Sequence, residues 1–297
     1  MQQPVVVVIG DIMVDVVVVP LGPFNRGSDT PSRVVVSPGG SAANQAVALA
    51  AAGAVAHLVA AVGDDGFGRA TAAALAATAV HAHLQVCPGQ RTGVVVALIG
   101  ASGERSMLTD RGANLTLGTD ALDPALFEAG RHLHLSGYVL LDEATRPVGL
   151  AALELAADAG MTRSVDPCSA GPLAAVGADA FLSWTEGIEW CCANLDEGRV
   201  LTGARHPDDV LVALRPYYHE AVVTLGAEGA LLSGPGTERL YCSADHVEVA
   251  DTTGAGDAFT GTFLARRLGS DGPEQALRAG LAAAARVVAE PGARSWS

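Results

Sequence analysis

The 297-residue sequence is long enough for one large α/β domain with a small appendage, and its 49% hydrophobic share indicates a well-filled core. A net charge of −14 argues against a nucleic-acid backbone as a partner. All 18 basic residues are arginine, which excludes a Gly-Lys-Ser/Thr phosphate loop, so a bound phosphate would have to meet backbone amides, arginine or a metal ion.

Cysteine usage and the start of the chain favour a cytoplasmic protein. The odd set of five cysteines has neither zinc nor redox spacing, so we expect reduced thiols. Asp11 and Asp15 interrupt the apolar start, which argues against a signal peptide. The alanine-rich run 41–62 contains polar residues, so it predicts a buried helix and strand rather than a membrane span.

The first third of the chain predicts a buried strand and a separate pair of hairpins. Val5–Ile9 is a β-branched run typical of a strand buried on both faces of a parallel sheet. Asp15 follows it, where ligands gather in such sheets, as a polyol ligand or as a solvated turn carboxylate. The apolar runs 16–19 and 34–36, with 92–99 and 105–109, predict strands outside the main βα alternation.

A glycine pair precedes the first predicted helix. Gly39 and Gly40 come before an Ala/Leu-rich helix to about Ala52, with Ser41 as a plausible cap. Asn44 lies one turn in, on the side of the glycines, where its amide can bond a sugar hydroxyl. A helix-start glycine pair with an incidental Asn is the alternative.

Strand–helix alternation is regular from residue 131 onward. Strands are expected at 132–138, 162–166, 188–193 and 222–225, which predicts a parallel sheet with helices on both faces, a three-layer α/β sandwich. His132 and His134 share one face of their strand; without a third ligand in view they are a weak metal candidate. Arg111 is either a clamp for an anionic part of a substrate or an exposed surface arginine.

The stretch Asp251–Asp257, Asp-Thr-Thr-Gly-Ala-Gly-Asp, carries the most chemistry. It lies between a predicted strand, 247–250, and a predicted helix, 258–268, so the amides of Ala255, Gly256 and Asp257 would form an anion hole at a helix N-terminus. A carboxylate at its lip suits phosphoryl transfer to an alcohol. The alternative is that Asp257 only caps the helix and the glycines serve a tight turn.

Together these runs resemble a known family. Gly39–Asn44 with the loop Gly63–Gly66 resembles the first signature of the ribokinase-like carbohydrate kinases, the phosphofructokinase B family, and Asp251–Asp257 resembles the second. Asn194-x-x-Glu197 and the run Thr224–Gly229 are similar to the family's metal and nucleotide motifs, in the right order and spacing. The resemblance implies one ribokinase-like kinase domain over residues 1–297, with a β lid from about 12–38 and 91–114.

The resemblance also implies roles. Asp257 would be the general base, and the amides of Gly254, Ala255 and Gly256 would stabilise the transferring phosphoryl group. The implied substrate-binding residues are Asp15, Gly39, Gly40, Asn44, Arg111 and Tyr138, and the implied ATP-binding residues are Asn194, Thr224, Gly226 and Gly229. Asn194 and Glu197 would hold Mg²⁺ through water. A monovalent cation, K⁺, would lie near Asp251, Thr253, Val288 and Gly292, and a homodimer would form through the lid.

Several positions depart from the family pattern. Met13 stands where ribokinase has Asn, the segment 138–141 lacks an acid, Leu281 replaces a His near adenine, and Cys168 follows Asp166-Pro167 where related kinases carry Asn. The expected activity is ATP-dependent phosphorylation of a sugar or sugar-like alcohol. A nucleoside kinase, or a non-catalytic sugar or nucleotide sensor on the same fold, is the alternative.

Overall fold

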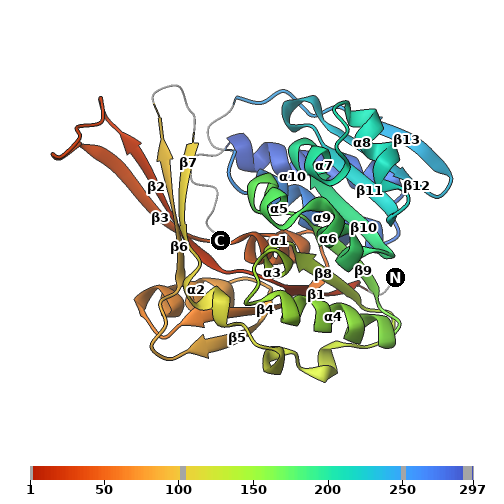
Figure 1. The fold of residues 1–297 in the computed structure, drawn as a ribbon, viewed down its shortest axis with the longest axis horizontal. Coiled ribbons are helices and arrows are strands. Elements are labelled where there is room, and N and C mark those ends of the chain that lie inside the picture. Colours follow the sequence, from red (N-terminus) through yellow and green to blue (C-terminus); the bar gives the residue numbers. More distant parts are fainter. Residues whose placement is uncertain (1–2, 101–104, 249–251, 290–295, 297) are drawn as a thin grey trace.

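The computed structural model describes residues 3–100, 105–248, 252–289 and 296. Within them, nine strands form a central sheet in the order β13-β12-β11-β10-β9-β8-β1-β4-β5 (Figure 1). Its strands are β1 (Val5–Ile9), β4 (Val55–Gly63), β5 (His81–Cys87), β8 (His132–Ser136), β9 (Thr162–Asp166), β10 (Ile188–Asn194), β11 (Tyr218–Thr224), β12 (Ala230–Gly234) and β13 (Thr237–Cys242). From β5 to β11 all neighbours are parallel, whereas β12 and β13 are antiparallel. The sheet is therefore mainly parallel, as predicted.

Helices cover both faces of this sheet and give three layers. One hydrophobic cluster packs α1, α2, α9 and α10 against one face, and a second packs α4 to α8 against the other. The helices are α1 (Ser41–Ala51), α2 (Gly66–Ala76), α3 (Tyr138–Leu141), α4 (Arg146–Asp158), α5 (Ala170–Val176), α6 (Ala178–Thr185), α7 (Leu195–Thr202), α8 (Pro207–Leu214), α9 (Ala255–Leu268) and α10 (Pro273–Ala289), with 3₁₀ turns η1 (Gly112–Thr116), η2 (Thr119–Ala121), η3 (Pro124–Leu126) and η4 (Gly226–Glu228). The predicted three-layer α/β architecture is confirmed.

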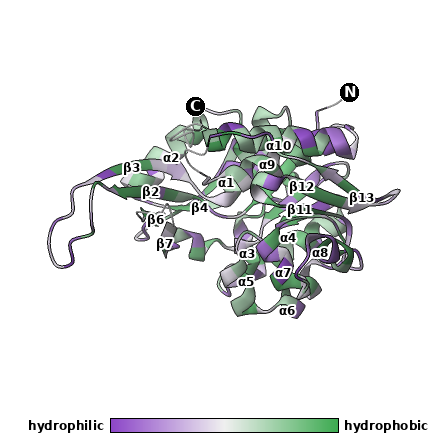
Figure 2. Ribbon diagram, turned by 90° about the horizontal axis from the view of Figure 1, so that it is seen from above, coloured by the Kyte–Doolittle hydropathy of each residue, from purple (hydrophilic) through white to green (hydrophobic). Residues whose placement is uncertain are grey.

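A second, four-stranded sheet projects from this body (Figure 1). Its order is β3-β2-β6-β7, with β2 (Met13–Pro20), β3 (Ser32–Gly39), β6 (Gly93–Ile99) and β7 (Arg105–Asp110). The segments predicted to lie outside the βα alternation thus pair with each other and not with the central sheet. Hydrophobic residues run along β2 and β3 where they extend outward (Figure 2), and Val34 and Val36 are more than half exposed at 56% and 53%.

Some local expectations were wrong. Val247 and Glu248 are not in a strand, and the rest of the predicted strand 247–250 lies outside the described residues. Ser41 is not the cap of α1: the N-cap is Gly40, and Ser41 is the first helical residue. No helix among the described residues is long and apolar enough to cross a membrane.

Candidate active site

Two adjoining cavities lie at the carboxyl ends of the parallel strands, where α1 and α9 begin. The larger, about 600 Å³, contains five of the six predicted substrate residues: Asp15, Gly40, Asn44, Arg111 and Tyr138. The smaller, about 90 Å³, is lined by Asp166, Asn194, Glu197, Thr224 and Gly256 among others. Ser41, Cys168 and Asp257 line both. Asp257 therefore lies where the two cavities meet.

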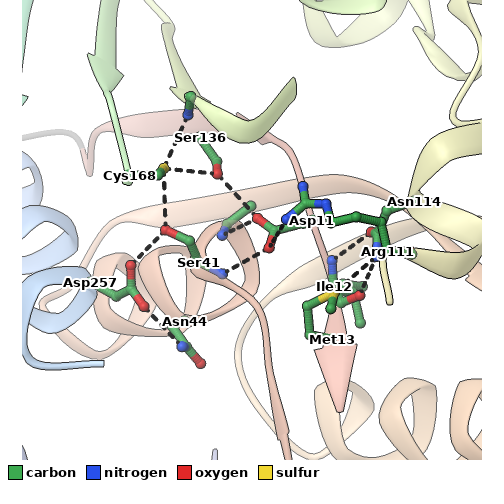
Figure 3. Close-up of polar contacts among 12 residues, drawn as sticks. Asp11, Ile12, Met13, Ser41, Asn44, Arg111, Asn114, Ser136, Cys168 and Asp257 are labelled. Atoms are coloured by element: carbon green, nitrogen blue, oxygen red, sulfur yellow. Dashed lines mark hydrogen bonds and ion pairs between the residues drawn. The ribbon is translucent and has the colours of Figure 1, made fainter. Parts of the chain in front are cut away.

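The carboxylate of Asp257 is held by side chains from α1 (Figure 3). One oxygen, Oδ1, accepts from the Ser41 hydroxyl at 2.7 Å. The same oxygen accepts from Gln45 Nε2 at 3.2 Å. The other, Oδ2, accepts from Asn44 Nδ2 at 2.9 Å. The N-cap of α9 is Gly254, which has no side-chain cap bond. The carboxylate thus bonds side chains of α1, which argues against the alternative that Asp257 only caps its own helix, α9.

The surroundings of Asp257 make its carboxyl a stronger base than usual. Its pKa is raised to about 8. Burial is the largest cause, the nearby carboxyls of Asp166 and Asp11 also raise it, and the hydrogen bonds from Ser41 and Asn44 act in the opposite sense. A general base works best when its pKa lies near the working pH. The environment therefore suits proton abstraction from an alcohol.

The backbone before Asp257 adopts the expected turn. Gly254 has φ 77°, a left-handed conformation that favours glycine, and α9 starts at the next residue. The amides of Gly256 and Asp257 lie in the first helical turn, where no intrahelical acceptor exists. The Ala255 amide donates to the Thr252 carbonyl at 3.3 Å. Of the predicted anion-hole residues, Gly256 lines the small cavity, whereas Gly254 lines a different one, between α1, α9 and α10.

Asp11 was not singled out in the sequence, yet it organises the start of α1. It follows β1, is buried, and accepts from the amides of Ser41 and Ala42, both at 3.3 Å. Ser136 donates to the same carboxylate at 3.1 Å (Figure 3). Asp11 thus caps α1 from a distance and leaves the Ser41 hydroxyl free for Asp257. Its place directly after a buried strand, in Gly-Asp-Ile, was the available signal.

The glycine pair creates room for these carboxylates. A Cβ at Gly39 would lie 2.6 Å from the Asp15 carboxylate, and one at Gly40, where φ is 98°, would lie 2.7 Å from the Asp11 carbonyl. Gly39 itself is not part of the cavity wall. The pair therefore supports the site sterically, and Gly40 also faces the larger cavity.

Arg111 is a component of the larger cavity and not a free surface residue. Its guanidinium lies 4.3 Å from the centre of the Tyr138 ring and 3.8 Å from Asp11, and its side chain is only 20% exposed. Stacking on an aromatic ring holds the planar group in place. One positive charge thus faces a cavity that is also lined by carboxylates, neutral polar side chains and apolar groups.

The predicted metal residues bond each other. The Asn194 side-chain oxygen caps α7 by accepting from the Glu197 backbone amide at 2.9 Å. The Glu197 carboxylate accepts from the Asn194 backbone amide at 2.8 Å and from Asn194 Nδ2 at 2.6 Å. This capping box explains both residues structurally. The capping box does not explain why two carboxyls, Glu197 and Asp166, are buried side by side at the small cavity. Burial raises the pKa of Glu197 to about 8 and that of Asp166 to about 6. Within the described parts of the chain, no arginine pairs with either carboxyl.

The run predicted to bind the nucleotide, Thr224–Gly229, follows β11. Thr224 lines the small cavity, whereas Gly226 and Gly229 line neither of the two site cavities. Gly229 has φ 119°, and a Cβ there would overlap the Cys242 carbonyl, so the fold alone requires this glycine. A Cβ at Gly226 would meet nothing within 4 Å.

The predicted cation residues are only partly described: Thr253 lines the larger cavity, Val288 belongs to α10, and Asp251 and Gly292 lie outside the described residues.

Known proteins resemble this chain over most of its length. A sequence model described as the pfkB family carbohydrate kinase matches residues 3–297. A 2-dehydro-3-deoxygluconokinase from Thermoproteus tenax is 34% identical, over 84% of this chain and 78% of its own. A probable fructokinase-4 from Arabidopsis thaliana is 30% identical, over 89% of this chain and 82% of its own. The solved structure of an adenosine kinase from Sinorhizobium meliloti superposes with a TM-score of 0.86 at 25% identity, over 97% of this chain and 95% of that one. The chain belongs to the pfkB family of carbohydrate kinases.

Proposed function

We propose that this kinase transfers the γ-phosphoryl group of ATP to a hydroxyl of a small sugar or sugar-like substrate, with Asp257 as the general base. The observation that carries the proposal is the position of the Asp257 carboxylate between the two cavities, fixed there by Ser41 and Asn44. The larger cavity would take the sugar. The smaller one, with Gly256 at its wall, would take the terminal phosphate.

The reaction needs positioning and charge stabilisation more than covalent help. Asp257 takes the proton of the attacking hydroxyl, whose oxygen forms a bond to the γ-phosphorus while the bond from that phosphorus to the ADP oxygen breaks. Of the Gly254–Gly256 segment, the amide of Gly256 lies in the first turn of α9, and with this residue at the wall of the small cavity it would stabilise charge on the phosphoryl oxygens. An ionised Asp257 is required, so activity rises as this carboxyl loses its proton.

A magnesium ion fits the small cavity. Asp166 and Glu197 are two buried carboxyls with raised pKa values and no cation beside them in the described structure, and oxygen ligands of this kind suit Mg²⁺. Asn194 and Glu197 would hold the ion through water, with Asp166 as an additional acidic group. When bound, the ion would neutralise phosphate charge.

Substrate and nucleotide would bind on opposite sides of Asp257. Asp15, Gly40 and Asn44 would contact sugar hydroxyls, with Gly39 as support, and the stacked pair of Arg111 and Tyr138 would contact the far end of the sugar. Thr224 would contact ATP, with Gly226 and Gly229 shaping the loop beside it. Arg111 favours substrates that carry an anionic group.

We also propose a potassium site, a homodimer and a cytoplasmic location. Potassium near Thr253 and Val288 would orient the anion-hole amides, so rates in potassium are expected to exceed those in sodium or choline salts. The exposed valines of β3, Val34 to Val36, favour a homodimer through the second sheet, which would also close over the sugar. Five free thiols suit the reducing conditions of a cytoplasm.

A panel of sugars, sugar acids and nucleosides, each with ATP and Mg²⁺, tests the proposal when ADP release is measured. We expect turnover on at least one sugar or sugar acid. Turnover confined to nucleosides would favour a nucleoside kinase. Tight ligand binding with no turnover on any member would favour a sensor and contradict the proposal.

A further inference from the structure

A continuous chain of buried polar side chains runs from the central sheet to Asp257. His132 and His134 on β8 both contact the Ser164 hydroxyl on β9, each at 2.7 Å, through His132 Nε2 and His134 Nδ1. The other nitrogen of His134, Nε2, lies 2.9 Å from Gln45 Oε1 on α1. Gln45, His134 and Ser164 are fully buried, and His132 is 2% exposed. Nothing in the proposed phosphoryl transfer itself uses these side chains.

The direction of every bond in this chain follows from Gln45. Its Nε2 faces Asp166 Oδ2 at 2.9 Å, Asp257 Oδ1 at 3.2 Å and Ser41 Oγ at 3.1 Å. The opposite amide orientation would set its oxygen against Asp166 Oδ2, an acceptor that already receives a bond from the Thr260 hydroxyl at 3.0 Å, so the nitrogen lies on that side. The oxygen Oε1 then accepts, and His134 must donate from Nε2.

The remaining protons are fixed in sequence. A neutral His134 with its proton on Nε2 accepts at Nδ1, so the Ser164 hydroxyl donates to it. Ser164 then accepts from His132 Nε2, and His132 Nδ1 accepts from the Thr162 hydroxyl at 2.8 Å. Each ring nitrogen has a partner, and burial lowers the pKa of His134 to about 3 and that of His132 well below its ordinary value. Both rings are therefore neutral in the working range of pH.

We propose that His134, held by Ser164 and His132, is a positioning residue that fixes the Gln45 amide so that its N–H groups point at Asp257 and Asp166. This proposal rests on the proposed role of Asp257 as base. A donor aimed at a carboxylate stabilises its ionised form. Other charged groups act on Asp257 as well: Asp166 at the end of β9, Asp11 after β1 and Glu197 on α7. Gln45 partly offsets their combined effect and keeps Asp257 available as a base.

The tautomers can be measured on the unmodified protein. Nitrogen-15 NMR at pH 7 is expected to show His132 and His134 as neutral rings with the proton on Nε2. A protonated ring, or a proton on Nδ1 of His134, would overturn the proposal. This measurement depends on neither turnover nor any variant, so it remains decisive if a substituted chain fails to fold.

Substitutions test the consequence for catalysis. His134→Leu removes the N–H group that donates to the Gln45 oxygen, so the Gln45 amide is no longer held with its nitrogen toward Asp257. The pKa of Asp257 should then rise, and the acid limb of the kcat–pH profile is expected to move up by ~1 pH unit. At pH values below that limb kcat should fall roughly tenfold, with KM for ATP unchanged. His134→Gln keeps a neutral N–H donor and is expected to restore most of this loss. His57→Gln is the matched control, because His57 on β4 bonds His83 at 3.0 Å, away from the site.

Two results would contradict the positioning role. One is a loss of kcat in His134→Leu without a shifted profile, and the other is a His134→Gln variant no better than His134→Leu. The outcome for Asp257→Asn separates the two levels of the account. An active Asp257→Asn enzyme rejects the proposed base, whereas an inactive one with an unshifted His134→Leu profile rejects only the role of His134.

Discussion

Gly261 on α9 touches the backbone of Gln45 on α1: a Cβ at position 261 would lie 2.5 Å from the Gln45 carbonyl oxygen. The two helices can approach this closely only because the side chain is absent. That approach lets Ser41, Asn44 and Gln45, all on α1, reach the carboxylate of Asp257 one turn before Gly261.

Gly261→Ala is therefore expected to separate the helices. Overpacking of this kind costs about 1–3 kcal/mol of unfolding free energy, and kcat should fall because the donors to Asp257 move away. Gly171→Ala on α5 is the control: its Cβ would meet nothing within 4 Å, so unchanged or slightly raised stability is expected. Urea unfolding and steady-state kinetics measure both. A fully stable and fully active Gly261→Ala enzyme would refute the role assigned to this contact.

Glu197→Gln separates the capping role of this residue from its metal role. Gln keeps an oxygen that can accept from the Asn194 backbone amide but loses the acceptor for the Asn194 side-chain amide, so stability at pH 7 is expected to fall by about 1 kcal/mol. The loss of a negative charge should raise the Mg²⁺ concentration needed for half-maximal rate by about tenfold or more. A magnesium titration of the rate, beside a thermal melt, gives both numbers. An unchanged Mg²⁺ requirement would leave Glu197 with a structural role alone.

Stability without ligands should fall as pH rises from 7 to 8.5. The pKa of Asp257 and of Glu197 is raised to about 8 in the folded protein, so the folded state binds more protons than the unfolded state up to that pH. The buried histidines act in the opposite sense, but only below about pH 6.5, where the unfolded rings begin to protonate. Urea unfolding across this window should show a shallower decline for Glu197→Gln. A stability that rises from pH 7 to 8.5 would disprove the assignment.

The overall architecture could be predicted from the sequence, and so could five of the six residues predicted to bind substrate that now share one cavity, because β-branched runs and glycine pairs specify structure locally. Val5–Ile9 and Gly39–Asn44 need little context to be interpreted. Asp11 and the chain through His134 could not be predicted, because their roles depend on contacts between residues far apart in sequence, as between His134 and Gln45. The strand expected at 247–250 failed in its described part because alternation over four residues is weak evidence for pairing.

Arg111→Gln should reveal the charge of the natural substrate. If the guanidinium contacts a carboxylate or phosphate, KM for that substrate is expected to rise by about 10- to 100-fold, since a charged hydrogen bond contributes ~1.5–3 kcal/mol. KM for ATP and turnover of neutral sugars should change little. Arg69→Gln, which removes an exposed pair with Asp64, is the control. If KM is unaltered for every accepted substrate, Arg111 has no contact with the sugar.

The kcat of Asp257→Asn tests the central claim most directly. The substitution keeps the shape of the side chain and an oxygen that accepts from Ser41 or Asn44, but it removes the base. We expect a loss on the order of 10²–10⁴ in kcat, with KM for ATP nearly unchanged and the fold intact by circular dichroism. A folded Asp257→Asn enzyme with near-normal kcat would contradict the assignment of Asp257 as the general base.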